Sequence, residues 1–214
     1  MIPEWFKQIL FLNGLPRSGK TLTLYRIIWR DHGKDLVLNL RKHKRIDGIR
    51  YTVDYIKARK RKPMHAYCIP KYKPYARYRF LELFRLKHPR IKHILIDEVE
   101  RYHLHRLIHL CRDVHYFYPN IPIILVGIMK DSYNRVFRTS QYLLDHCRSK
   151  NISPRCHFCH RKSSYMLNVL HHNKITYHEI DCIGDKSTQK HIKHVMRRYL
   201  VCSKHFFNPP LKKL

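Results

Sequence analysis

Acidic residues are scarce in this chain of 214 residues. The sequence has 15 Asp and Glu against 44 Lys and Arg, which gives a formal net charge of +29 at pH 7. Such a charge attracts polyanions, including nucleic acids, nucleotides and acidic surfaces. The basic residues are dispersed along the whole chain, however, as they are on the solvated faces of ordinary domains. Charge alone therefore assigns no function.

Long apolar runs are also missing. No stretch of about eighteen uncharged apolar residues occurs, so we expect no membrane-spanning helix. The N-terminal residues lack a basic segment followed by an apolar core and a cleavage site, so we expect no secretory signal and a cytoplasmic protein. With 44% hydrophobic residues, the chain is long enough to bury one ordinary core and to carry a small appendage.

Apolar segments of two kinds alternate over the first two thirds of the chain. Strands are predicted at 9–12, 35–40, 92–98 and 121–127, and helices at 22–30, 75–87 and 104–116. Alternating strands and helices are typical of a parallel sheet, so the predicted fold class is α/β, a P-loop parallel sheet flanked by helices. Residues 41–67 are very basic and are expected to form a loop.

The composition changes near residue 150. Beyond it the sequence is rich in His, Lys and Cys and shows little helical or strand regularity. We therefore predict two parts, an α/β core at 1–149 and a small appended module at 150–214.

A phosphate-binding loop is predicted where the first strand meets the first helix. The motif G-x-x-x-x-G-K-[ST] is matched by Gly14-Leu15-Pro16-Arg17-Ser18-Gly19-Lys20-Thr21. Its glycines let backbone N–H groups converge on phosphate oxygens at the positive end of the following helix. Lys20 is expected to reach the β- and γ-phosphates of ATP, and the Thr21 hydroxyl to join the Mg²⁺ shell. The candidate nucleotide-binding residues are Gly14, Arg17, Ser18, Gly19, Lys20 and Thr21.

Two carboxylates follow the apolar strand at residues 94–96. Ligands of open parallel sheets gather at the carboxyl ends of the strands. Asp97 is therefore expected to hold Mg²⁺ directly or through water. Glu98 is placed to accept a proton either from water, which would make an ATPase, or from a substrate hydroxyl, which would make a kinase. The two residues alone leave both reactions open.

The cysteines favour a metal site over disulfide bonds. Seven cysteines, an odd number, are expected to stay reduced in the absence of a secretory signal. Cys156 and Cys159 form a C-x-x-C pair, and Cys202 and His205 form a C-x-x-H pair. Three thiolates and one imidazole make a closed tetrahedral set suited to structural Zn²⁺, which would hold together a small polar module.

Other ligand sets stay open at this point. His160 or Cys182 is an alternative to His205, and a tail rich in Cys and His can also contain four unconnected residues.

In this order, the motifs resemble those of the type II thymidine kinase family, in which a P-loop α/β domain precedes a zinc-held lasso domain. The resemblance covers most of the chain and is carried by Gly14–Thr21, Ile96-Asp97-Glu98, Gly127–Phe137 with Leu143 and Leu144, and the flanks of the two cysteine pairs. It implies a deoxynucleoside kinase, with thymidine as the first expected substrate, that uses ATP and Mg²⁺ and contains structural Zn²⁺. It also implies a homotetramer.

The resemblance assigns further roles to particular residues. Glu98 would be the general base on the nucleoside 5′-hydroxyl, and Arg50 would steady phosphate oxygens with its two-pronged guanidinium. The segment 179–185 resembles the strand and turn whose backbone contacts the thymine edge. The implied substrate-binding residues are Tyr133, Phe137, Ile183 and Gly184.

Several positions depart from the family pattern. Pro16 and Arg17 replace a hydrophobic and an aromatic residue, and Arg101 replaces an aromatic of the base pocket. One extra residue separates Asp47 from Arg50. Another preferred deoxynucleoside, or loss of activity, therefore stays open.

Two alternative functions remain at this stage. A P-loop protein that binds nucleic acid would use its positive charge and a stretch in which rings alternate with cations, Lys71, Tyr72, Lys73, Tyr75, Arg77, Tyr78, Arg79 and Phe80. A P-loop ATPase without a nucleoside acceptor would use the same phosphate loop and strand-end carboxylates, although the predicted zinc module argues against it.

Overall fold

The structure, a computed structural model, describes residues 3–15, 18–31, 35–39, 52–56, 64–68, 74–131, 135–170, 175–176 and 196–210. Its helices are α1 (Glu4–Lys7), α2 (Lys20–Arg30), α3 (Pro74–Lys87), the short 3₁₀ helix η1 (Val99–Arg101), α4 (Leu104–Phe117), α5 (Arg138–His146) and α7 (Ser203–Phe207). Its strands are β1 (Leu10–Gly14), β2 (Asp35–Asn39), β3 (Thr52–Ile56), β4 (Met64–Cys68), β5 (His93–Ile96), β6 (Ile123–Ile128), β7 (Arg148–Asn151), β8 (Tyr165–Leu170), β9 (Ile175–Thr176) and β10 (Met196–Val201).

The larger sheet has seven strands in the order β3-β4-β2-β5-β6-β1-β7. All neighbouring pairs are parallel except β3 and β4. The register pairs Gly14 of β1 with Ile128 of β6, and Ile96 of β5 with Leu125 of β6. The carboxyl ends of β1 and β5 therefore lie at the same edge of the sheet, separated by β6. The predicted α/β class is confirmed.

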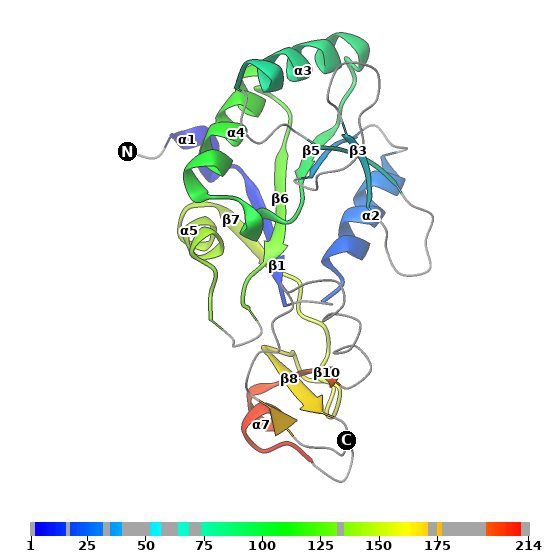
Figure 1. The fold of residues 1–214 in the computed structure, drawn as a ribbon, viewed down its shortest axis with the longest axis vertical. Helices are drawn as coiled ribbons and strands as arrows, with labels where there is room; N and C mark the ends of the chain where they lie inside the picture. Colours follow the sequence, from blue (N-terminus) through cyan, green and yellow to red (C-terminus); the bar gives the residue numbers. More distant parts are fainter. Residues whose placement is uncertain are drawn as a thin grey trace.

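Side chains alternate between the two faces of this sheet, and each face has its own core. In β1, Phe11 joins one cluster and Leu12 the other. Helix α2 covers the Leu12 face with Leu24 and Ile28, which lie one helical turn apart. The opposite face is covered by α1, α3, α4 and α5 (Figure 1). The two apolar layers hold the strand ends that carry the candidate site.

Two sequence expectations about regularity are wrong. Residues 41–67 were expected to form a loop, yet β3 and most of β4 lie within this range. Each is only five residues long and sits in a basic stretch without an apolar run, so strand periodicity is hard to detect there. The segment after residue 150 was expected to have little regular structure, but it contains β8, β9, β10 and α7.

The smaller sheet has the order β10-β8-β9 and lies at the end of the molecule toward which β6 points (Figure 1). Its core is small: among the described residues, one buried cluster is formed by Cys156, Leu167, Val169, Val201 and Cys202. The division into parts at 1–149 and 150–214 stays a prediction, and the large sheet itself extends to Asn151 through β7.

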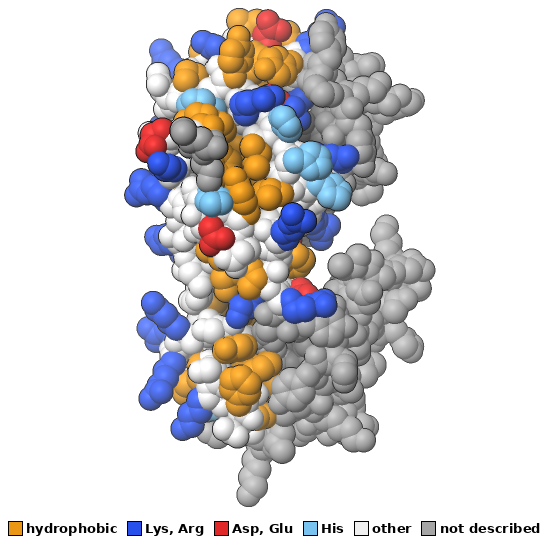
Figure 2. Space-filling view, turned by 90° about the vertical axis from the view of Figure 1, so that its left-hand side faces the viewer, with side chains coloured by type: hydrophobic (Ala, Val, Ile, Leu, Met, Phe, Trp, Pro, Cys, Tyr) orange, Lys and Arg blue, Asp and Glu red, His pale blue; other side chains and the backbone are white. Residues whose placement is uncertain are grey.

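The surface agrees with a dispersed positive charge. On the face shown in Figure 2, Lys and Arg side chains are spread along the length of the molecule, with hydrophobic side chains between them. Across the described ranges, no helix has both the length and the hydropathy needed to cross a lipid bilayer.

Candidate functional site

The phosphate loop begins at the end of β1, where the chain leaves no room for a side chain. A Cβ on Gly14 would lie 2.5 Å from the backbone oxygen of Ile152 and 2.6 Å from Ser18 Oγ. The turn continues with a hydrogen bond of 3.1 Å from the Ser18 N–H to the Leu15 carbonyl. Gly19 follows with φ +94°, and α2 begins at Lys20. The sequence thus produces the tight strand–turn–helix path that a phosphate loop requires.

Lys20 lies buried beneath this turn. Its Nζ donates hydrogen bonds to the carbonyl oxygens of Gly14 and Leu15 at 3.1 and 2.6 Å and to Ser18 Oγ at 3.4 Å. Burial lowers the pKa of Lys20 to about 8, although the carboxylates of Glu100 and Asp97 act to raise it. The ammonium group of Lys20 therefore interacts electrostatically with the strand-end carboxylates of Asp97 and Glu100. Thr21 follows in the first turn of α2, half-buried.

Asp97 and Glu98 leave the end of β5 in a bent backbone. The Asp97 N–H donates to the Leu38 carbonyl of β2 at 3.0 Å, and Asp97 Oδ1 accepts a 2.9 Å hydrogen bond from the Glu98 N–H. Burial raises the pKa of Asp97 to about 6. Glu98 has φ +55°, in the left-handed region, and its Oε2 lies 3.5 Å from Arg101 Nε. Non-glycine residues held in this region cost about 1 kcal/mol or more and are concentrated at functional sites.

Glu100 is a third carboxylate at this edge, and the sequence reasoning missed it. Its Oε2 accepts a 3.0 Å hydrogen bond from the Ile128 N–H at the end of β6, and burial raises its pKa. A Cβ on Gly127 would lie 3.0 Å from this oxygen and 2.5 Å from Val99 Cγ2, so the glycine is required for the close approach. Asp97 and Glu100, the two carboxylates that act on the buried Lys20, leave an excess of negative charge, which suits a divalent cation.

Replacing Asp97 is expected to stabilise the protein near neutral pH. The raised pKa means that the folded state keeps a proton between pH 3.8 and about 6 that the unfolded state releases. Below pH 3.8 the Asp97 carboxyl is protonated in both states and does not lower the free energy of unfolding. As pH rises through about 6, the folded protein has to carry a buried carboxylate, and the free energy of unfolding falls. After allowance for partial exposure, Asp97→Asn should raise the free energy of unfolding at pH 7 by about 1–2 kcal/mol.

The measurement is urea unfolding of wild type and Asp97→Asn from pH 4 to 8. The exposed Asp145 provides a matched control, because Asp145→Asn removes the same charge from the surface of α5. A variant Asp97→Asn that is less stable than wild type at pH 7 would contradict this account of the site.

The candidate metal centre brings together Cys156, Cys159, Cys202 and His205, whose ligand atoms all lie within 4.8 Å of one another. His205 Nδ1 is 3.4 Å from both Cys156 Sγ and Cys202 Sγ, and the Sγ atoms of Cys159 and Cys202 are 3.7 Å apart. In a zinc tetrahedron with Zn–S bonds of about 2.3 Å, ligand atoms are separated by about 3.5–3.8 Å. The donor set and its spacing therefore fit Zn²⁺.

The surrounding backbone positions these four ligands. A turn closed by a 2.6 Å hydrogen bond from the Cys156 N–H to the Arg161 carbonyl holds the first pair, and Cys202 precedes α7, which carries His205. Burial acts to raise the pKa of the Cys156 thiol, but hydrogen bonds from nearby backbone N–H groups and from His205 outweigh it and lower the pKa to about 6. A thiol that ionises readily is suited to bind a metal. Among the described residues, His160 is not part of the cluster.

The C-terminal part contacts the edge that carries the phosphate loop. The Ile152 N–H donates to the Asn13 carbonyl of β1 at 2.7 Å. Lys130, just after β6, places its Nζ 4.9 Å from the centre of the Tyr165 ring in β8. Phe137 is half-buried at the start of α5, where its N–H donates to the Met129 carbonyl at 3.1 Å. The segment between β6 and α5 therefore lies at the junction of the two sheets.

Several predicted site residues lie outside the described residues. They are Arg17, Arg50, Tyr133, Ile183 and Gly184, together with the alternative metal ligand Cys182. Their proposed roles stay predictions.

A sequence model of the thymidine kinase family matches residues 7–194. The chain belongs to the thymidine kinase family. A thymidine kinase of Enterococcus faecalis is 28% identical over 117 residues, which span 54% of this chain and 55% of that protein. A thymidine kinase of Streptococcus thermophilus is 28% identical over 213 residues, or 97% of each chain. The second metal pair, Cys202 and His205, lies beyond the residues matched by the family model.

Likeness to solved structures is weaker. A crystal structure of Bacteroides Pif1 bound to ssDNA shares 14% identity, covers 68% of this chain and 36% of that one, and gives a TM-score of 0.33. A score this low supports no functional inference. Membership in the thymidine kinase family confirms the resemblance seen in the motifs and the expectation of an ATP-dependent thymidine kinase.

Proposed function

We propose that the protein transfers the γ-phosphate of ATP to the 5′-hydroxyl of a deoxynucleoside, with thymidine as the first candidate. One observation supports the proposal beyond family membership: Lys20 of the phosphate loop interacts electrostatically with carboxylates at the strand ends. Lys20 is buried at the start of α2, and the carboxylates of Glu100 and Asp97 act on its pKa. Nucleotide phosphates and a metal-binding, proton-accepting edge would therefore meet in one place.

The proposed chemistry assigns one task to each side chain. Backbone N–H groups of the loop 14–21 and the Lys20 ammonium bind the triphosphate, while Thr21 and Asp97 hold Mg²⁺, which supplies positive charge to the phosphates. The Glu98 carboxylate accepts the proton of the 5′-hydroxyl. The hydroxyl oxygen then bonds to the γ-phosphorus as the bond to the β,γ-bridging oxygen breaks, and ADP leaves.

The C-terminal part would close over the nucleoside. The contact of Lys130 with Tyr165 supports this arrangement, because it joins the smaller sheet to the loop after β6. In the proposed complex, Phe137 and Tyr133 contact the nucleoside, and the backbone at 183–184 contacts the base edge. Arg17 and Arg50 contact phosphate oxygens. Zn²⁺, bound by the four-residue cluster, would supply structural support and take no part in the reaction. The homotetramer implied by the family is part of the proposal, and light scattering of the purified protein tests it.

The experiment is a phosphorylation assay of zinc-loaded protein with ATP, Mg²⁺ and a panel of nucleosides. Thymidine, deoxyuridine and deoxycytidine are compared, with the product identified by mass spectrometry. The proposal predicts a 5′-monophosphate of thymidine at the highest kcat/KM. If none of the three nucleosides is phosphorylated, the proposed function is wrong.

The alternative of nucleic-acid binding loses part of its support in the structure. In the stretch where rings alternate with cations, Phe80 is buried and Arg77 pairs with the buried Asp113 of α4. Neither side chain is available to stack on a base or to contact a phosphate. Of the side chains of this stretch that the structure describes, Tyr78 and Arg79 are exposed, whereas Lys71, Tyr72 and Lys73 lie outside the described residues. The test is the affinity for single-stranded DNA across a salt series: weak binding with a shallow dependence on salt concentration would remove this alternative.

A further inference from the structure

A second cluster of candidate metal ligands lies at the amino edge of the large sheet, opposite the phosphate loop. Asp31 directly follows α2, Asp35 begins β2, and His93 begins β5. The parallel register pairs Asp35 with His93 directly. The ligand atoms of the three side chains lie within 4.8 Å of one another. Neither the family motifs nor the proposed reaction uses these residues.

The cluster is buried and contains more acceptors than its proton donor can serve. The side chains of Asp31 and Asp35 are 5% and 0% exposed, and that of His93 is 20% exposed. His93 Nδ1 is 3.1 Å from Asp35 Oδ1, with which it is hydrogen-bonded, and 2.9 Å from Asp31 Oδ2. A ring nitrogen carries at most one proton. Within the described part of the chain, Asp31 Oδ2 and Asp35 Oδ2 therefore have no hydrogen-bond partner.

Among the described residues, the neighbouring Lys and Arg side chains pair with Asp31 and not with Asp35. Lys92 Nζ and Arg30 Nε lie 3.5 and 3.6 Å from Asp31 Oδ1, the other oxygen of that carboxylate, and both side chains are mostly exposed. Asp31 also lies at the C-terminal end of α2, where the helix dipole disfavours a negative charge. Burial raises the pKa of Asp35. Burial acts to raise the pKa of Asp31, but the charges of His93, Arg30 and Lys92 outweigh it and lower the pKa. The oxygen that lacks a compensating donor or charge among the described residues is Asp35 Oδ2, which is buried.

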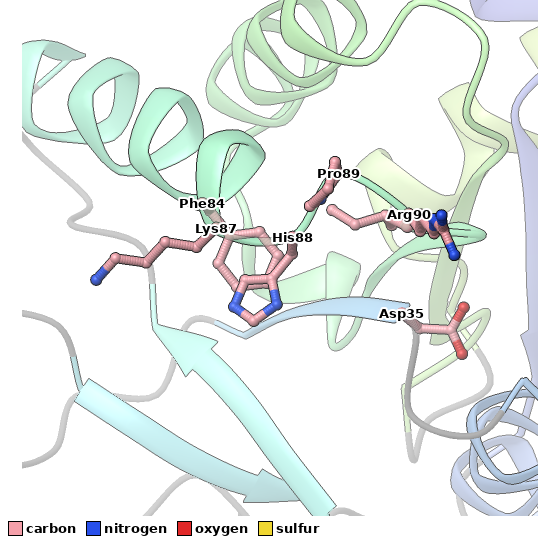
Figure 3. A pocket seen from close by; sticks show the side chains of 7 residues that line it. Asp35, Phe84, Lys87, His88, Pro89 and Arg90 are labelled. Carbon is pink, nitrogen blue, oxygen red and sulfur yellow. The ribbon is translucent and has the colours of Figure 1, made fainter.

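A pocket lies beside the cluster. Asp35 lines a pocket of about 270 Å³ together with Phe84, Lys87, His88, Pro89, Arg90 and Ile91. Figure 3 shows the Asp35 carboxylate at one edge of this group of residues, pointing away from the rings of His88 and Phe84.

We propose that Asp31, Asp35 and His93 bind a divalent cation. Two carboxylate oxygens and one imidazole nitrogen, without sulfur, suit an oxygen-preferring divalent ion such as Mn²⁺, with water completing its coordination. The bound ion joins the end of α2 to the first residues of β2 and β5. Because the phosphate loop lies at the other end of α2, the ion fixes the helix that presents the loop, and its role is structural.

The test uses Mn²⁺ and electron paramagnetic resonance, without nucleotide and without an activity readout. The protein is full-length, zinc-loaded and carries Asp97→Asn, so that the opposite edge of the sheet does not bind the metal. We expect one bound Mn²⁺ per chain, with a hyperfine coupling to one imidazole nitrogen. Adding Asp31→Asn or Asp35→Asn should weaken Mn²⁺ binding at least tenfold, and His93→Gln should abolish the nitrogen coupling. Adding Asp145→Asn, the same change on an exposed helix surface, should alter neither.

Two results would overturn the proposal. One is the absence of stoichiometric Mn²⁺ binding by the folded Asp97→Asn protein, which would mean that the imidazolium proton is the cation of this cluster. The other is Mn²⁺ affinity that is unchanged by Asp31→Asn and by Asp35→Asn. Circular dichroism and the zinc content of each variant establish that it is folded, and His93→Gln, which leaves both carboxylates in place, provides an independent reading if either Asn variant unfolds.

Discussion

Glu98→Gln is expected to lower kcat for nucleoside phosphorylation by about 10³-fold, because general-base catalysis contributes about 10²–10⁴-fold to such rates. Glutamine keeps the size of the side chain and cannot accept the proton of the 5′-hydroxyl. The affinity for ATP should stay nearly the same, since the phosphate loop and Lys20 are untouched. The measurements are single-turnover phosphorylation of the nucleoside and calorimetric titration with an ATP analogue.

A matched control separates the role of Glu98 from the loss of one negative charge. Glu82 is exposed on α3, on a helix that does not carry the site, so Glu82→Gln changes the net charge equally. Its kcat should equal that of wild type. Full kinase activity in Glu98→Gln would show that another group accepts the proton, and Glu100 would then be the next candidate.

Cys156→Ser is expected to release the metal and unfold the smaller sheet. Structural zinc sites contribute about 10 kcal/mol or more of folding free energy, and a serine hydroxyl is a poor replacement for a thiolate. The buried cluster around Leu167 and Val201 is too small a core to compensate. Zinc content should fall from about one ion per chain to nearly none. Limited proteolysis should then cut between residues 150 and 210 while the large sheet survives.

Cys147 provides the control for this experiment. It is a free, half-buried cysteine at the end of α5 and is not part of the metal cluster. Cys147→Ser should therefore keep zinc and the resistance to proteolysis. Retention of stoichiometric zinc by Cys156→Ser would mean that the ion is bound by a different set of ligands.

The catalytic edge could be predicted because its signals are local. The phosphate loop is a contiguous motif between an apolar strand and an amphipathic helix, and Asp97 follows an apolar run that can only be a buried strand. In parallel sheets the carboxyl ends of such strands meet at one edge. Glu100 belongs to the same edge but lies within the 3₁₀ helix η1, and its hydrogen bond with Ile128 depends on a strand distant in the sequence.

The identity of the fourth metal ligand could not be settled from spacing. His160 and His205 are both close to a cysteine in the sequence. In the structure His160 lies in a turn with φ +60°, next to the first cysteine pair, whereas His205 lies on the first turn of α7 after Cys202. Antiparallel pairing of β8 with β10 brings the two cysteine pairs together, and no local pattern in the sequence specifies this long-range pairing.

The cluster at the amino edge was equally hidden. Asp31, Asp35 and His93 resemble ordinary surface residues when they are taken one at a time in the sequence. Their proximity depends on the register of β2 against β5, which is decided by the packing of both faces of the sheet. Nonlocal clusters of this kind become visible only when the topology is known.

The coupling between ATP consumption and nucleoside phosphorylation tests the central claim most directly. ADP and nucleoside monophosphate are quantified in the same reaction, with and without thymidine. A kinase centre built from the phosphate loop and Glu98 predicts one ADP for each thymidine monophosphate, and almost no ADP when the nucleoside is omitted. Rapid ADP formation that is independent of thymidine would show that the edge activates water, and the protein would then be an ATPase.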